Sequence, residues 1–252
     1  MDWTKRDEFH VSPGYQPLLR EAGLDAEGVF THSDIEVWRS IPERENGVLD
    51  VIREDGSRTR VHVKRYHATG QRVTPAKQEA EGIRLLQDAG IATVPLVGWG
   101  EMADGRSFIL SEDLAGYEPA DKAVARGVSF DQLLIPLARM AGRLHQANLH
   151  HRDLYLCHFF VNEELDVRLI DAGRVKKLPG WPFRRRWVVK DLAQVAHSMA
   201  EAGVAAGWFE AFLREYGDLN LLRAVRAKAG RIGRHDRRLR ERQPTRNVSI
   251  PK

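Results

Sequence analysis

The chain has 252 residues, 42% of them apolar, which suffices for one large core or for two lobes of roughly 100 residues each. Its net charge of +4 is uneven: residues 221–252 hold eleven Lys and Arg against two acids, so the first 220 residues carry −5. The single cysteine excludes an internal disulfide, the charged start lacks the apolar core of a signal peptide, and no run approaches the roughly 18 apolar residues that span a bilayer. Composition therefore predicts a globular cytoplasmic protein with a basic C-terminal tail.

The first part of the chain predicts a sheet with one helix. Residues 1–34 are a mixed polar leader with a short helix expected at 15–22, and we assign them no chemistry. Thr74 and Pro75 mark the start of a helix that ends before Gly90. Around it we expect strands at residues 35–38, 47–52, 59–66, 93–97 and 107–110. This order predicts an N-terminal lobe, residues 1–111, with an antiparallel meander.

Residues 112–252 form the predicted C-terminal lobe, which is mainly helical. Apolar residues recur at helical spacing from Leu133 to Leu144, and another helix is expected at 190–200. Between these helices lies a polar loop that begins at His150, and the basic tail begins at about residue 221.

Alternation in the strand at 59–66 places its valines on one face and His62 and Lys64 on the other. Taken alone, Lys64 is best explained as an edge-strand lysine kept for solubility. Glu79, however, lies on the apolar face of the following helix, where a carboxylate needs a cationic partner. We therefore expect Lys64 to pair with Glu79, with Glu81 as the reserve.

Two aspartates in the second lobe have suitable positions for chemistry. Asp153 lies between a helix and a strand, where a carboxylate can accept a hydroxyl proton, although a turn-forming Asp is the commoner explanation. Asp171 ends an apolar strand ahead of Ala172 and Gly173, which suits a Mg²⁺ ligand as well as an ordinary strand end.

Two other site types are disfavoured by spacing. His150, His151, Cys157 and His158 suggest zinc, but no second ligand pair follows at finger-like spacing. Cys157 is better explained as a small buried residue. A Ser/His/Asp hydrolase is disfavoured more strongly than a zinc site, because no Gly-x-Ser-x-Gly elbow occurs in the sequence.

The sequence from His151 to Phe159 reads His-Arg-Asp-x-Tyr-x-Cys-His-Phe, and it resembles the Kdo/WaaP lipopolysaccharide kinase family, also called InaA-like. The resemblance covers about residues 35–200. It implies an α+β, two-lobed, protein-kinase-like fold with ATP between the lobes. It also implies phosphoryl transfer from ATP to an inner-core sugar of lipopolysaccharide, heptose or Kdo.

By this resemblance, Asp153 is the catalytic base and Asp171 the Mg²⁺ ligand, while Lys64 holds the ATP phosphates with Glu79 as its partner. Asp191 corresponds to the aspartate that fixes the catalytic loop in such kinases, and His151 supports the same loop. A favourable charge at a helix N-terminus explains Asp191 equally well.

Three features depart from protein kinases. Residues 40–47 contain one glycine where those enzymes have a glycine-rich loop. His158 stands where they place an asparagine that binds a second Mg²⁺; imidazole is a poor Mg²⁺ ligand, so His158 either binds metal or contacts Asp153 or phosphate. His62 replaces a small residue over adenine, which assigns it to the nucleotide site.

The acceptor and the partners follow from basic segments. Arg174–Lys190 is only 17 residues long and contains Arg184–Arg186, which suits an anionic sugar or glycolipid better than a peptide; a solvated loop is the alternative. We expect the basic tail to contact the cytoplasmic face of the inner membrane, with disordered solvation as the alternative and nucleic acid disfavoured.

Two alternative functions remain open at this point. One is a pseudokinase, a regulatory module that binds nucleotide without turnover. The other is a small-molecule phosphotransferase of the aminoglycoside type.

Overall fold

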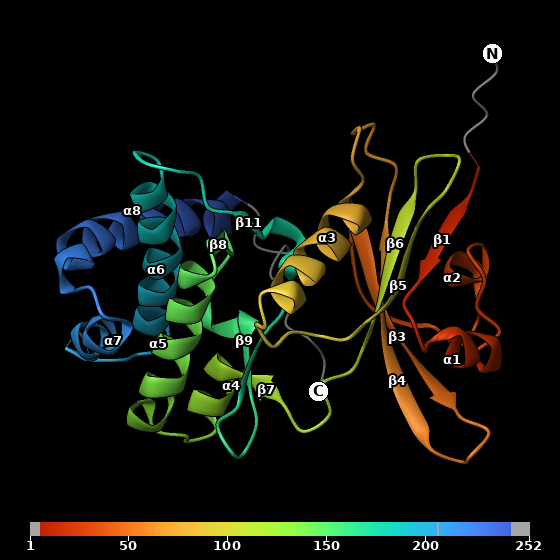
Figure 1. Ribbon diagram of the computed structural model, residues 1–252, viewed down its shortest axis with the longest axis horizontal. Helices are drawn as coiled ribbons and strands as arrows, with labels where there is room; N and C mark the ends of the chain where they lie inside the picture. Colours follow the sequence, from red (N-terminus) through yellow and green to blue (C-terminus); the bar gives the residue numbers. More distant parts are fainter. Residues whose placement is uncertain (1–5, 206, 243–252) are drawn as a thin grey trace. The chain divides into compact units, whose positions relative to one another are not determined.

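The computed structural model describes residues 6–205 and 207–242 and contains two compact units (Figure 1). Of the described residues, the first unit comprises those up to Ile83 together with Val94–Asp113, and the second comprises Arg84–Thr93 and those from Leu114 onward. An antiparallel sheet dominates the first unit and helices dominate the second. The predicted α+β class is therefore confirmed.

The sheet of the first unit has six antiparallel strands in the order β1-β5-β6-β4-β3-β2. All five expected strands are present, with shifted ends. The bounds are β1 Glu8–Val11, β2 Glu36–Ile41, β3 Arg44–Ile52, β4 Arg58–Tyr66, β5 Leu96–Glu101 and β6 Ser107–Glu112.

The segment at residues 40–47, expected as a connection, is mostly strand. Ile41 pairs with Arg44, so Pro42 and Glu43 alone form the turn between β2 and β3. The start of β3 pairs in register with the end of β4, where Arg65 also forms an ion pair with Glu45. Ladder hydrogen bonds thus outweigh the weak strand preference of these polar residues.

The leader covers one face of this sheet. Its helices α1 (Gln16–Glu21) and α2 (Gly28–Thr31) contribute Leu18 and Val29 to a core that also contains Val61 and Val63. The helix α3 (Pro75–Asp88) lies on the other side of the sheet (Figure 1). The two β4 valines, which alternation puts on one face of the strand, are both buried, and the leader is the structural reason for it.

Strand β5 extends past Val97, where the prediction ended it, because its glycines allow β1 to approach. A Cβ at Gly98 would lie 2.9 Å from the Phe9 ring, and one at Gly100 would lie 2.5 Å from the Glu8 carbonyl oxygen. Strand β1 itself was not predicted, since four alternating residues give a weak signal.

Helices pack together in the second unit. Helix α7 packs on α5, and α8 packs on α6. The long helix α5 starts with a capping box in which the Ser129 hydroxyl accepts from the Gln132 amide. The bounds are α4 Ala120–Ala125, α5 Phe130–Gln146, α6 Arg184–Glu201, α7 Trp208–Tyr216 and α8 Leu222–Arg242.

Short strands and turns join these helices. The strands β7 (Glu118–Pro119), β9 (Phe159–Val161) and β10 (Val167–Leu169) form one small sheet, and β8 (Leu149–His150) pairs with β11 (Lys176–Lys177). The 3₁₀ turns are η1 Leu156–His158, η2 Ala172–Arg174 and η3 Leu219–Leu221. No described helix is long and apolar enough to span a membrane.

Helix α6 begins six residues earlier than predicted, so Arg184–Arg186 form its first turn and are not a solvated loop. The buried side chains of Val188 and Val189, in the next turn, explain the extension, since they give the start of α6 an apolar face.

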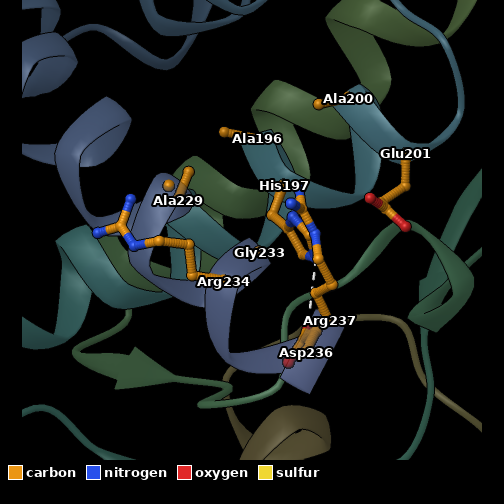
Figure 2. Close-up of a pocket in the computed structure, with 10 residues that line it drawn as sticks. Ala196, His197, Ala200, Glu201, Ala229, Gly233, Arg234, Asp236 and Arg237 are labelled. Atoms are coloured by element: carbon orange, nitrogen blue, oxygen red, sulfur yellow. Dashed lines mark ion pairs between the residues drawn. The ribbon is translucent and has the colours of Figure 1, made fainter. Parts of the chain in front are cut away.

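The described part of the basic tail is also ordered, as the helix α8. Figure 2 shows α8 beside α6, where the His197 ring and the Asp236 carboxylate form an ion pair with Nε2 and Oδ2 3.0 Å apart. A Cβ on Gly233 would lie 3.3 Å from the His197 ring, so glycine allows this close packing. Disordered solvation is therefore wrong for residues 222–242, and residues 243–252 lie outside the described chain.

We expect Gly100→Ala to destabilise the protein by about 1–3 kcal/mol, because the added methyl group would overlap the Phe108 ring and the Glu8 carbonyl. Urea unfolding would measure this. Gly142→Ala in α5 is the control: its nearest neighbour is 4.0 Å away and alanine favours a helix by up to about 1 kcal/mol. Equal stability of the two variants would contradict the packing of β1 on β5.

Candidate active site

In the first unit, Lys64 and Glu79 form the expected pair. The Lys64 ammonium donates to Glu79 Oε1 at 2.6 Å, and the Tyr66 hydroxyl donates to Oε2 of the same carboxylate at 2.7 Å. Glu79 is almost fully buried, whereas the Lys64 side chain is 22% exposed. Both oxygens of the Glu79 carboxylate thus accept hydrogen bonds, and the Lys64 ammonium is held in a partly exposed position.

His62 lies two residues before Lys64 on the same face of β4 and contacts an acid. Its Nε2 lies 2.7 Å from Asp113 Oδ1. The hydrogen bond with His62 lowers the pKa of Asp113 from its ordinary value. The His62 ring is therefore held in one orientation in the middle of β4.

In the second unit, the loop at residues 151–157, here called the anchored loop, is fastened to one face of α6. Three α6 side chains spaced at i, i+3 and i+7 accept its backbone N–H groups. Asp191 accepts from His151 at 2.7 Å and from Arg152 at 2.8 Å, Gln194 accepts from Leu154 at 3.1 Å, and Ser198 accepts from Leu156 at 3.0 Å. The position of the anchored loop is therefore set by α6.

Asp191 is the most buried of these acceptors, with no exposed surface. Burial alone would raise its pKa, but hydrogen bonds from His145 and from the backbone outweigh it and keep the pKa below the ordinary value. Asp191 stands eight positions into α6, so the alternative explanation, a charge at a helix N-terminus, is excluded.

His151 supports the anchored loop from inside. Its ring is fully buried, and Nε2 donates to the Ile170 carbonyl oxygen at 3.0 Å. Arg152 next to it has a positive φ of 68°, and its carbonyl oxygen accepts from Lys190 at 2.6 Å and from Gln194 at 3.2 Å. These contacts hold an uncommon backbone conformation directly before Asp153.

The side chains of Asp153, His158 and Asp171 converge. Each offers one potential ligand atom, and the three atoms lie within 4.8 Å of one another. The Asp153 carboxylate also receives Gln194 Nε2 at 3.4 Å and lies 3.7 Å from Arg174. Two carboxylates at this spacing fit a divalent cation with oxygen ligands.

His158 connects the two aspartates. Nδ1 donates to the Asp153 carbonyl oxygen at 2.6 Å, and Nε2 lies 3.6 Å from Asp171 Oδ2. Burial would lower the pKa of the ring, but the Cys157 side chain and the Asp171 charge raise it to about 10. A protonated ring has no free lone pair for a metal, so in this state His158 orients Asp171 instead.

The backbone conformation of Asp171 sets the direction of its side chain. Its φ is 57°, in the left-handed region that aspartate tolerates better than most residues, and the turn η2 starts directly after it. This bend at the end of the strand turns the Asp171 side chain toward His158.

The structure thus brings the predicted site residues together in two groups. Lys64, Glu79 and His62 belong to the first unit, and the residues around Asp153 belong to the second. The expected burial of Cys157 is wrong, because η1 turns Leu156 inward and leaves Cys157 exposed.

Sequence reasoning missed three anchoring residues. Gln194 and Ser198 share a helix face with the predicted residue Asp191, and Tyr66 shares a strand face with the predicted residue Lys64. The same helical and strand periodicities could therefore have indicated these three anchoring residues.

We expect Asp191→Asn to loosen the anchored loop, because an amide has one acceptor oxygen and would turn an N–H donor toward a backbone N–H. The cost should be about 1–3 kcal/mol, with faster hydrogen exchange at residues 151–157. Asp166→Asn, at an exposed acid in the β9–β10 turn, is the control. Unchanged exchange in the Asp191 variant would contradict the anchoring role.

The same variant should show a defined pH dependence. Because folding lowers the pKa of Asp191, its stabilisation is fully present above the ordinary value of 3.8 and is lost as the pH falls below it. The stability difference between wild type and Asp191→Asn should therefore be largest near neutral pH and shrink below about pH 4. Urea unfolding at several pH values would measure this trend, and a difference that grew in acid would contradict it.

The solved structures that resemble this chain include one with a bound kinase inhibitor. The co-crystal structure of WbdD and the kinase inhibitor LY294002 matches with a TM-score of 0.49 and 19% identity, over 78% of this chain and 45% of that one. This chain thus spans less than half of that structure, and the similarity is too low to support a conclusion.

Curated relatives are closer. The lipopolysaccharide core heptose(I) kinase WaaP of Pseudomonas aeruginosa is 31% identical over 189 residues, 66% of this chain and 68% of the relative. The protein of the same name in Escherichia coli K12 is 29% identical over 193 residues, 64% of this chain and 70% of the relative.

A family match covers most of the chain. Residues 36–216 match the lipopolysaccharide kinase (Kdo/WaaP) family, a range that includes both groups of site residues. The expected enzyme class, a phosphotransferase with an alcohol group as acceptor, is confirmed by this match and by the named relatives. The chain therefore belongs to the lipopolysaccharide kinase (Kdo/WaaP) family.

Proposed function

We propose that the protein transfers the γ-phosphoryl group of ATP to a hydroxyl of an inner-core sugar of lipopolysaccharide. The convergence of Asp153, His158 and Asp171 within 4.8 Å is the observation that carries this proposal. The relatives from Pseudomonas aeruginosa and Escherichia coli are named heptose(I) kinases, so heptose is the acceptor to test before Kdo.

Asp153 is the proposed catalytic base. Gln194 and Arg174 lie near its Oδ1, and the anchored loop fixes its backbone, so the carboxylate is held to orient the acceptor hydroxyl and take its proton. Positioning of this kind supplies much of the rate in phosphoryl transfer, which needs little covalent chemistry from the protein.

Asp171 would hold Mg²⁺, with the Asp153 carboxylate as its neighbour. The ion, when bound, neutralises charge on the phosphates of the nucleotide. His158 would keep Asp171 oriented through its ring, and it would become a ligand only after losing the proton that the Asp171 charge stabilises.

In the first unit, Lys64 is the proposed contact for the ATP phosphates. Glu79 holds the ammonium while Tyr66 holds the second carboxylate oxygen, so the lysine is presented in one orientation. His62, fixed by Asp113, is the proposed contact for the base of the nucleotide.

The proposal also covers the class of acceptor and the place in the cell where the protein acts. An anionic glycolipid acceptor and action at the cytoplasmic face of the inner membrane suit the family.

We expect Asp153→Asn to lower phosphoryl transfer about 100-fold or more, because the amide cannot accept the hydroxyl proton. The assay incubates heptose-terminated lipopolysaccharide with Mg·ATP and follows the mass of the acceptor. Asp131→Asn, at an exposed acid in α5, is the control. Wild-type turnover in the Asp153 variant would remove the base assignment. No transfer by the wild-type protein, with Mg·ATP bound, would favour the pseudokinase alternative.

We expect Glu79→Gln to raise the KM for ATP about tenfold or more, since a neutral amide no longer fixes the Lys64 ammonium by charge. The matched control is Glu81→Gln, two residues along α3, whose side chain is exposed. A larger effect from Glu81→Gln would instead make the reserve residue the partner of the phosphate-binding lysine.

A further inference from the structure

Two aromatic side chains stand out on the surface of the second unit. Trp181 is 93% exposed and Phe183 is 60% exposed, just before α6. Single exposed apolar residues are ordinary, but two large aromatic groups within three residues are a local patch. This patch has no role in the site described above.

The sequence around the patch is strongly basic. From Arg174 to Lys190 there are seven Lys and Arg and no acid. Three of these cations have partners in the protein: Arg174 lies near Asp153, Arg184 donates to Asn148 Oδ1 at 2.6 Å, and Lys190 donates to the Arg152 carbonyl oxygen.

Four cations of this segment remain exposed, and they flank the aromatic pair: Lys176, Lys177, Arg185 and Arg186. Among the described residues none of the four has an acid within ion-pair distance; Arg186 lies 5.7 Å over the Trp187 ring. The surface made by residues 176–186 is here called the docking segment. It combines apolar aromatic tips with uncompensated positive charge.

We propose that the docking segment binds the surface of an anionic phospholipid bilayer. Trp181 and Phe183 would enter the interface between headgroups and acyl chains, where aromatic rings are favoured, while the four flanking cations would contact anionic headgroups. A soluble polyanion would use the cations and leave both aromatic rings in water.

The place of the docking segment in the fold supports this occupant. Its start is tied to the core because Lys176 pairs with His150 in the β8–β11 ladder, and its end is the first turn of α6. His150 directly precedes the anchored loop. The docking segment therefore begins beside the strand that leads into the loop carrying Asp153. This step rests on the proposed function, since a membrane-embedded glycolipid acceptor would be presented to that loop.

Helix α8 is a weaker candidate for the same task. Its arginines are exposed, but Arg226 lies 3.9 Å from Glu210, and the large exposed apolar side chains of the described chain lie elsewhere. Among the side chains of α8 that the structure describes, none is large, apolar and exposed, so bilayer contact is better assigned to the docking segment than to the basic tail.

Flotation of the full chain with vesicles tests the proposal. Wild type should bind vesicles of phosphatidylglycerol and phosphatidylcholine at least about tenfold better than vesicles of phosphatidylcholine alone. Trp181→Ala with Phe183→Ala should lose most of this binding, and Arg185→Gln with Arg186→Gln should lose its dependence on the anionic lipid. The matched control is Arg231→Gln with Arg234→Gln on α8, which should bind as wild type does.

Wild-type binding by both docking-segment variants, or loss of binding in the α8 control alone, would overturn the proposal. So would binding that needs Arg185 and Arg186 but not the aromatic pair. A second readout separates this inference from the proposed function: phosphorylation of a deacylated, water-soluble acceptor should be unchanged by Trp181→Ala with Phe183→Ala. If wild type phosphorylates no acceptor yet binds the vesicles, the proposed function fails and the docking segment stands.

Discussion

The buried carboxylate of Asp191 is the contact on which the arrangement of the second unit depends. It receives the N–H groups of His151 and Arg152, and the next turns of α6 continue the pattern through Gln194 and Ser198. The anchored loop has little regular secondary structure, so its buried N–H groups must find acceptors elsewhere, and an unsatisfied one costs about 1–3 kcal/mol. The loop therefore takes its shape from α6, and Asp153 is placed by residues about 40 positions away in the sequence.

The charge at the Asp153 cluster follows from the same packing. Two carboxylates near each other repel unless a positive charge lies close to them. The protonated His158 ring supplies that charge beside Asp171, and Arg174 supplies it beside Asp153. A divalent cation would be a stronger source of positive charge at the same place, which would release the ring from this role. His158 therefore connects the two aspartates, with one ring nitrogen on the Asp153 carbonyl oxygen and the other beside the Asp171 carboxylate.

The sequence was most informative where chemistry and local period agreed. Alternation in β4 and the apolar face of α3 were enough to pair Lys64 with Glu79. The His-Arg-Asp motif singled out Asp153, and a strand end ahead of Ala172 and Gly173 singled out Asp171. Features set by distant partners could not be predicted in this way. The role of the leader follows only from the packing of its helices against the β4 valines. The start of β3 is a strand because it pairs with β4. Helical spacing could have indicated Gln194 and Ser198, because they share a helical face with Asp191. Their role as acceptors, however, depends on the loop that crosses that face.

Helix α6 links three surfaces that are separate in the sequence. Its first turn carries Arg185 and Arg186, its middle holds the anchored loop, and its last turns receive α8 through His197 and Asp236. His197 forms an ion pair with Asp236 of α8, whereas the neighbouring Ser198 accepts from the Leu156 N–H of the anchored loop. The packing of α8 and the anchoring of Leu156 therefore involve the same turn of α6. Glycine at position 233 keeps α8 close enough for this contact. The part of the basic tail that the structure describes, α8, therefore packs on the same helix that anchors the loop before Asp153.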